Sequence, residues 1–158
     1  VKYEFAARGS MPPVTVYWYE GGLKPPVPAG LPKDVKLGDP NGGANGSLFI
    51  GDKGRIAIAH DGQPKLLPED QFADFKGPEP YLPKSPGHHA QWIAACKTGS
   101  RTGSNFGYAG PFTEIVLLGN VAFRAGTTIE FDPSTGKITN APKAEQFLTK
   151  SYRKGWGV

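Results

Sequence analysis

The chain has 158 residues and a formal net charge of +4, and its single Cys excludes both an internal disulfide framework and a multi-cysteine metal site. Gly and Pro make up about a quarter of the sequence, roughly twice their usual share, and this excludes a helix bundle because both residues are unfavourable inside helices. The 38% of hydrophobic residues argues against wholesale disorder, so about one folded domain is predicted.

The first twenty residues predict two strands joined by a turn. Apolar and charged residues alternate over residues 1–5, and a similar alternation over residues 14–19 carries bulky side chains on both faces. Residues 9–13 are rich in turn formers and separate the two strands. A strand with aromatic residues on both faces indicates that a partner, a helix layer or a substrate packs on each side.

Residues 21–46 form an arm that is rich in Pro and Gly and has no periodic pattern. It is long for a connection inside a compact domain, so either a binding loop or a packing arm between domains or subunits is expected. Its glycine-rich part, 38–46, lacks the Lys-Ser/Thr pair of a phosphate-binding loop. The chain also has no G-x-G-x-x-G between a strand and a helix, so this chain alone is not expected to bind a dinucleotide.

A hairpin is predicted next, with strands at 47–50 and 55–60 around the turn 51–54. The dipeptide 61–62 closes the second strand, and residues 65–67 are interpreted as a short third strand. Residues 68–84 are predicted to be a loop.

Two helices follow. The first is predicted to have Ser85 as N-cap and Pro86 as its first residue, with Gly99 as its stop signal. An apolar stripe along it is interpreted as buried, with His89 a core or interface histidine and Cys96 a structural thiol. The second helix covers 108–125, where a glycine is expected to let another backbone approach closely; this glycine is Gly119.

The C-terminal part is predicted to hold a last hairpin and a short helix. Residues 128–132 and 137–139 flank a turn, residues 142–150 form the helix, and residues 151–158 form a tail. The order of elements predicts an α+β fold with a mostly antiparallel or mixed open sheet and two main helices on one face.

Charge and hydropathy limit the partners. The basic residues are scattered, whereas a nucleic-acid-binding surface concentrates them on one face, so no nucleic-acid partner is expected. No apolar run approaches the roughly 20 residues that a membrane span needs, so no membrane partner is expected either.

The adjacent pair His88 and His89 cannot both face one metal, because neighbouring helical positions are about 100° apart. No metal site is expected.

Six segments carry a family resemblance, and SPGHH, YRKGW and the aromatic strand are its most specific parts. In chain order the segments are YEFAARGSMPPVTVYWYEGG, LKPP, GSLFIGDKGRI, PKSPGHHAQWIAAC, SNFGYAGPFTEIVLLGN and YRKGW. Together they resemble the C-terminal half of bacterial Gfo/Idh/MocA oxidoreductases, the relatives of glucose-fructose oxidoreductase and inositol dehydrogenase. The branch found in planctomycetes and Bacteroidetes is the most similar, and the resemblance covers essentially all of residues 1–158.

The resemblance implies a two-domain parent that oxidises a sugar or cyclitol hydroxyl by hydride transfer. Its N-terminal Rossmann domain binds NAD or NADP, and this chain is the single domain for substrate binding and oligomerisation, truncated on its N-terminal side. The family's Glu-Lys-Pro motif and its segment with the catalytic His are absent here, so the chain alone is expected to be inert and to bind no cofactor. The family's sheet face pairs with another subunit, which implies a homo-oligomer. Relatives often carry a twin-arginine export signal, so the resemblance is compatible with a location in either the bacterial cytoplasm or the periplasm.

Polar side chains in loops and at helix starts are the candidates for substrate contacts, because such positions can hydrogen-bond sugar hydroxyls. They are Arg8, Lys84, His88, Asn105 and Tyr108. An alternative hypothesis is a non-enzymatic carbohydrate-binding β module. In this alternative, Tyr3, Trp18 and Tyr19 form a platform on which sugar rings stack. In the oxidoreductase hypothesis, the same three residues are part of the subunit interface.

Overall fold

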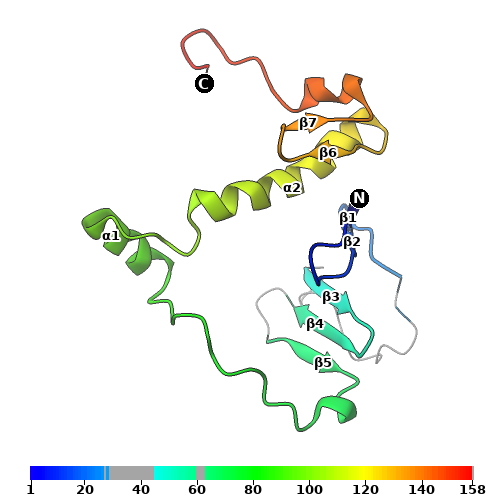
Figure 1. Ribbon diagram of the computed structural model, residues 1–158, viewed down its shortest axis with the longest axis vertical. Coiled ribbons are helices and arrows are strands. Elements are labelled where there is room, and N and C mark those ends of the chain that lie inside the picture. The colour runs from blue at the N-terminus through cyan, green and yellow to red at the C-terminus, as the bar shows by residue number, and fades with distance from the viewer. Residues whose placement is uncertain (27, 29–44, 60–62, 158) are drawn as a thin grey trace. The chain divides into compact units, whose positions relative to one another are not determined.

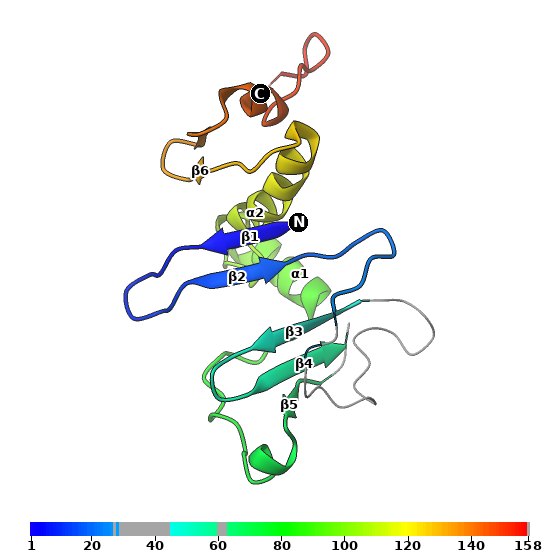
Figure 2. The ribbon, with the colours of Figure 1, turned by 90° about the vertical axis from the view of Figure 1, so that its right-hand side faces the viewer.

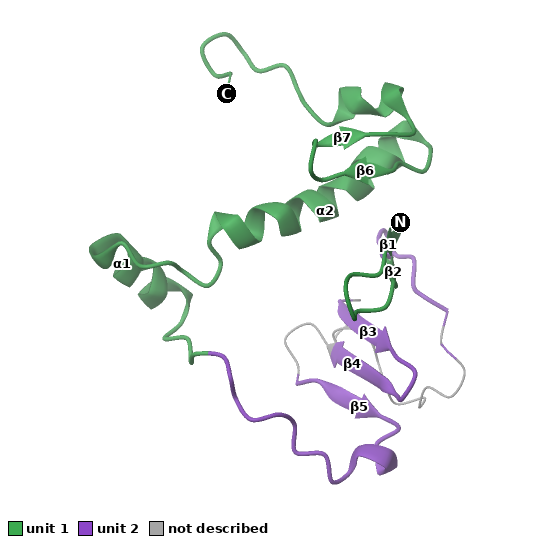
Figure 3. Cartoon of the chain, in the orientation of Figure 1, with its two compact units in different colours: residues 1–17, 83–158 green, residues 18–82 purple. Residues whose placement is uncertain are grey.

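The computed structural model describes residues 1–26, 28, 45–59 and 63–157 (Figure 1). The described residues form three small antiparallel sheets, two α-helices and two short 3₁₀ helices, and this confirms the predicted α+β class with two main helices. Two compact units divide the chain, Val1–Tyr17 with Pro83–Val158 and Trp18–Leu82 (Figure 3). Most of the arm predicted at 21–46 lies outside the described residues, as does the turn at 61–62.

In the first unit, β1 (Lys2–Phe5) and β2 (Val14–Tyr17) form an antiparallel hairpin (Figure 2). The second strand ends two residues earlier than predicted, so Trp18 and Tyr19 lie beyond it. Residues paired across antiparallel strands share a face, so the register separates an apolar from a polar side. The apolar hairpin face carries Tyr3, Phe5, Val14 and Val16. The polar hairpin face carries Lys2, Glu4, Thr15 and Tyr17.

The second unit contains the sheet β3-β4-β5, formed by Gly46–Ile50, Arg55–Ala59 and Lys65–Leu67. The predicted hairpin and third strand are confirmed, and the turn is closed by the Gly51 amide donating to the Gly54 carbonyl at 2.9 Å. A 3₁₀ helix, η1 (Asp70–Phe72), follows. The Phe72 ring lies so close to Gly54 that a Cβ there would be 2.6 Å from its Cζ, so Gly54 is required for this contact.

Helix α1 spans His88–Thr98, and its predicted start is wrong. Gly87 is the N-cap, with φ at 103°, a conformation that interrupts the helical path between Pro86 and His88. Ser85 instead accepts a hydrogen bond from the Gly87 amide at 3.1 Å and stabilises the turn before the helix. The predicted stop is confirmed, because Gly99 adopts the left-handed conformation and its amide donates to the Ala95 carbonyl.

The predicted burial of the apolar stripe on α1 within this chain is also wrong, whereas an interface role for His89 stays a prediction. No residue of α1 is buried, Trp92 is 65% exposed, and both His89 and Cys96 are exposed. The amphipathic pattern identifies the apolar face of a helix, but that face is buried only where another surface packs against it. In the described unit no such surface covers α1.

Helix α2 spans Phe106–Ala125, begins two residues earlier than predicted, and ends as predicted at Gly126. A close approach does occur at Gly119, but the neighbour is the Tyr3 side chain rather than a second backbone. The Tyr3 hydroxyl donates to the Val116 carbonyl at 3.1 Å, so β1 lies against the middle of α2.

The best-buried part of the first unit lies at the C-terminal end of α2. There β6 (Phe131–Asp132) and β7 (Lys137–Ile138) form the predicted last hairpin, and the predicted short helix is the 3₁₀ helix η2 (Pro142–Phe147). Val121, Ile138 and Ala144 form the core between these elements.

Candidate functional site

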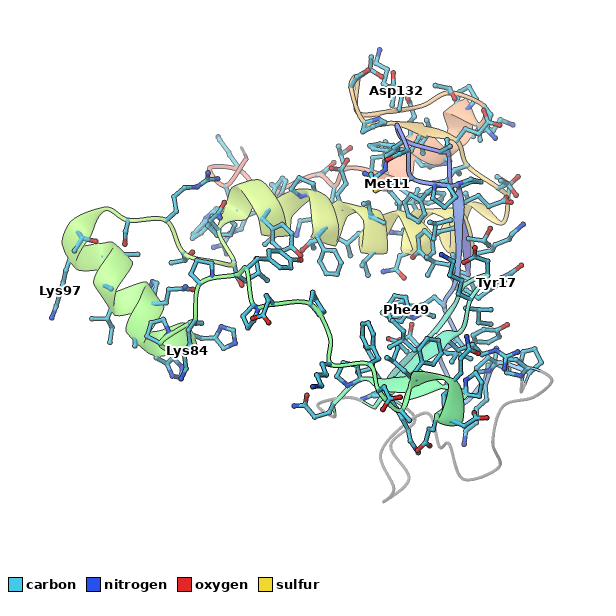
Figure 4. All side chains as sticks on the ribbon, turned by 60° about the horizontal axis from the view of Figure 1, so that its bottom comes forward. Met11, Tyr17, Phe49, Lys84, Lys97 and Asp132 are labelled. Atoms are coloured by element: carbon cyan, nitrogen blue, oxygen red, sulfur yellow. The ribbon has the colours of Figure 1, made fainter. Side chains whose placement is uncertain are left out.

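All five predicted substrate-contact residues lie in the first unit, but the structure groups only some of them. Arg8 bridges to Met11 in the hairpin turn. Lys84 precedes α1 (Figure 4), and His88 is the first residue of that helix. Asn105 is the N-cap of α2, and Tyr108 lies in its first turn. Asn105 and Tyr108 are brought together, because the Tyr108 amide donates to the Asn105 carbonyl at 3.0 Å.

The side chain of Asn105 is held by its own loop. Its Nδ2 donates to the Thr102 carbonyl at 2.9 Å, and its Oδ1 accepts from Arg101 Nη2 at 3.2 Å. The Tyr108 ring is 67% exposed and stacks parallel to Phe112 with ring centroids 6.5 Å apart. The start of α2 therefore presents an exposed tyrosine ring and an asparagine side chain held by its own loop, and both residue types can hydrogen-bond a polyhydroxy ligand.

The three aromatic residues of the proposed stacking platform have different surroundings. Tyr3 is half-buried, its hydroxyl is bonded to α2, and its ring lies 6.5 Å from that of Phe5. Burial raises the pKa of the Tyr3 phenol above its ordinary value. Trp18 and Tyr19 are exposed, and Trp18 Nε1 donates to Glu20 Oε2 at 3.2 Å. Tyr3 is therefore a packing residue of the hairpin, whereas Trp18 and Tyr19 belong to the second unit.

The apolar hairpin face is the main candidate interface of the first unit. Tyr3 on this face contacts α2, and Phe5, Val14 and Val16 are 37%, 50% and 40% exposed. The polar hairpin face instead carries a Lys2–Glu4 ion pair at 2.7 Å. Contiguous apolar side chains beside a polar rim mark surfaces that another polypeptide covers.

Two hollows lie outside the predicted residues. One, of about 330 Å³, is lined by the turn between β3 and β4 with Phe49 and Phe72. The other, of about 550 Å³, lies between the last turn of α2 and η2 and is lined by residues that include Arg124, Thr127, Lys143, Gln146 and Phe147. None of the five predicted residues lines either hollow. Arg124 and Lys143 were not predicted from the sequence, because α2 and η2 pack against each other across an intervening hairpin and no sequence motif indicates this contact.

The described residues do not fit a dinucleotide or a metal. Neither α1 nor α2 follows directly on a strand, so the described chain has no strand–turn–helix unit to cradle a pyrophosphate. No group of three or more His, Cys, Asp or Glu side chains is placed to hold a metal ion among the described residues. Across that same part of the chain, every helix is too short or too polar to cross a membrane.

Comparison of the chain with models of protein families, with curated proteins and with solved structures found no match. What can be said of function rests on the residues themselves.

Proposed function

We propose that the chain is the substrate-binding and oligomerisation domain of an NAD(P)-dependent oxidoreductase acting on a sugar or cyclitol, with the cofactor bound by a separate Rossmann domain. Two features support the proposal. One is the resemblance of six segments, in order, to Gfo/Idh/MocA oxidoreductases. The other is the α+β fold with antiparallel sheets, in which no strand–turn–helix unit occurs among the described residues.

The structural observation that supports the oligomerisation part of the proposal is the apolar hairpin face. Phe5, Val14 and Val16 point to one side of a two-stranded sheet and stay exposed, although the opposite side is polar. Fully burying a side chain of this size stabilises by about 1.5–3 kcal/mol. Contact with a second copy of the chain would bury the part of these side chains that is still exposed and would gain a fraction of this free energy, which supports the proposed homo-oligomer through the sheet face.

The substrate contacts of this proposal come from side chains at the helix starts and the hairpin turn. Asn105 and Tyr108 lie together at the start of α2, and Lys84 and His88 lie around the start of α1. Arg8, in the hairpin turn, completes the set. Hydrogen-bond donors and acceptors of these kinds match sugar hydroxyls, while hydride and proton transfer fall to the cofactor domain.

Sedimentation velocity with two matched variants of β2 tests the oligomer. Val16→Lys places a charge on the apolar hairpin face, whereas Thr15→Lys places the same charge on the polar face one residue away. We expect the unmodified chain and Thr15→Lys to associate at micromolar concentration. Val16→Lys should raise the dissociation constant of the oligomer about tenfold or more, because an unpaired charge is costly to bury. A monomeric unmodified chain, or equal weakening by both variants, would contradict the interface.

A further inference from the structure

The hollow between α2 and η2 is built on the best-buried part of the first unit. One of its lining residues is Ala144, which is 3% exposed and packs with Val121 and Ile138 in the core. The hollow is open to solvent, has a volume of about 550 Å³ and has exposed polar side chains in its lining. Because the walls come from a helix end and a packed 3₁₀ helix, the hollow exists before any ligand arrives.

Arg124 is held in place at the rim of this hollow. It lies in the last turn of α2, and its guanidinium carbon is 4.6 Å from the centre of the Phe147 ring, on the last residue of η2. Stacking on an aromatic face fixes the plane of the guanidinium and leaves its N–H edges available. Such a fixed fork of donors suits the two oxygens of a carboxylate or phosphate, and little side-chain entropy is lost when the anion binds.

The other polar residues of the hollow add donors without adding negative charge. Lys143 supplies a second cation, and Thr127 supplies a hydroxyl. The Gln146 amide nitrogen donates to the Lys143 carbonyl at 2.7 Å, which holds η2 together. Among the described residues no Asp or Glu lines the hollow, and Glu145, next to Ala144, lies outside the lining. The C-terminal carbonyls of α2 contribute about half a negative charge, so two cations leave the hollow net positive.

We propose that the α2–η2 hollow binds a small anion that carries a carboxylate or phosphate group, with Arg124 as the bidentate contact and Lys143 as the second cation. The site is separate from the substrate contacts proposed at the helix starts. Its existence does not depend on the oxidoreductase proposal, because the lining residues alone carry it.

Titration of the full chain followed by amide NMR tests the site, with inorganic phosphate in one arm and succinate in the other. We expect saturable shifts at residues 124–127 and 142–147 with a Kd on the order of 1 mM at low salt. Binding of phosphate alone, of succinate alone or of both supports the site and identifies the group it takes. No saturable shift at these amides in either arm, up to about 50 mM, overturns it.

Three variants separate this site from general attraction to a basic protein. Arg124→Gln and Lys143→Gln should each weaken binding about tenfold, because each removes a charge-assisted hydrogen bond. Arg124→Lys should weaken it about threefold, since the charge stays but the planar fork is lost. Lys137→Gln, exposed on β7 outside the lining, is the control and should leave binding unchanged. Unchanged shifts at Val121 and Ile138 show that the core is intact, and Lys143→Gln tests the site without altering α2. Equal weakening by Lys137→Gln and Arg124→Gln overturns the proposal.

Discussion

The contact between Tyr3 and Gly119 decides how closely β1 approaches α2. The Tyr3 hydroxyl reaches the Val116 carbonyl at 3.1 Å, and a Cβ at Gly119 would lie 2.9 Å from Tyr3 Cζ. Glycine is unfavourable inside a helix by roughly 0.5–1 kcal/mol relative to alanine, so its presence here needs a packing reason. The Tyr3 ring supplies that reason, because it occupies the space a side chain would take.

Gly119→Ala is therefore expected to destabilise the first unit by about 1–3 kcal/mol, although alanine favours helices. The reason is steric, since Tyr3 must move and loses its bond to Val116. Urea unfolding monitored by circular dichroism measures the change. The control is the same substitution in a Tyr3→Ala background, where the obstacle is gone and Gly119→Ala should stabilise by roughly 0.5–1 kcal/mol. A destabilisation of equal size in both backgrounds would contradict the contact.

Asp132, the last residue of β6 before the turn to β7, provides a prediction that depends on pH (Figure 4). Its carboxylate accepts hydrogen bonds from the Ser134 hydroxyl at 2.6 Å, the Thr135 hydroxyl at 2.8 Å and the Ser134 amide at 2.9 Å. These donors favour the charged form and lower the pKa of Asp132 below its ordinary value of 3.8. A lowered pKa in the folded state adds stability above pH 3.8, and this contribution is lost as the pH falls through the folded pKa.

Carbon-detected NMR titration of the Asp132 carboxyl is expected to give a pKa below 3.8 in the unmodified chain. Ser134→Ala combined with Thr135→Val removes two of the donors and should raise the pKa of Asp132 toward that value. Asp132→Asn should remove part of the stability loss seen on acidification below pH 3.8. A pKa of Asp132 that does not respond to loss of the two hydroxyls would contradict the assignment.

At the scale of single elements, the sequence predicts best what a few neighbouring residues determine. Both helix stops were predicted correctly, because Gly99 and Gly126 adopt a left-handed conformation that the preceding turn requires. The start of α1 was predicted wrongly for an equally local reason, since Gly87 also takes a positive φ and the helix cannot extend back to Pro86. The burial of α1 could not be predicted, because it depends on a surface that the sequence of the helix does not specify.

The packing of the last hairpin on α2 gives an element-scale prediction. Ile138 on β7 is 3% exposed and lies in the core with Val121 and Ala144. Ile138→Ala should destabilise the first unit by about 2–5 kcal/mol, through lost burial and the cavity left behind. Lys137→Ala, one residue earlier and exposed on the same strand, should change stability by less than about 0.5 kcal/mol. Thermal unfolding of the two variants side by side measures the difference, and equal effects would show that Ile138 is not a core residue.

At the scale of the whole molecule, the candidate sites divide by how far apart their residues lie in the sequence. Asn105 and Tyr108 were predicted as a group because both belong to one helix start. The α2–η2 hollow was not predicted, because Arg124 and Phe147 are joined only by the packing of two elements that a hairpin separates. The apolar hairpin face could be predicted in part. The alternation of apolar and polar residues predicts which residues belong to it, whereas the register between the two strands is known only from the structure.

The last prediction concerns the whole chain, which is expected not to bind NAD(P). If the chain supplies substrate contacts and the subunit interface while another domain holds NAD(P), calorimetry should detect no saturable binding of NADH or NADPH below about 1 mM. Because both cofactors are polyanions and the chain has a net charge of +4, weak attraction is expected at low salt and should fade as salt is added. The α2–η2 hollow is a second source of weak binding, and Arg124→Gln should weaken it about tenfold. Micromolar binding that survives both the added salt and Arg124→Gln would mean that this chain contains a dinucleotide site, and the proposed division of labour between two domains would be wrong.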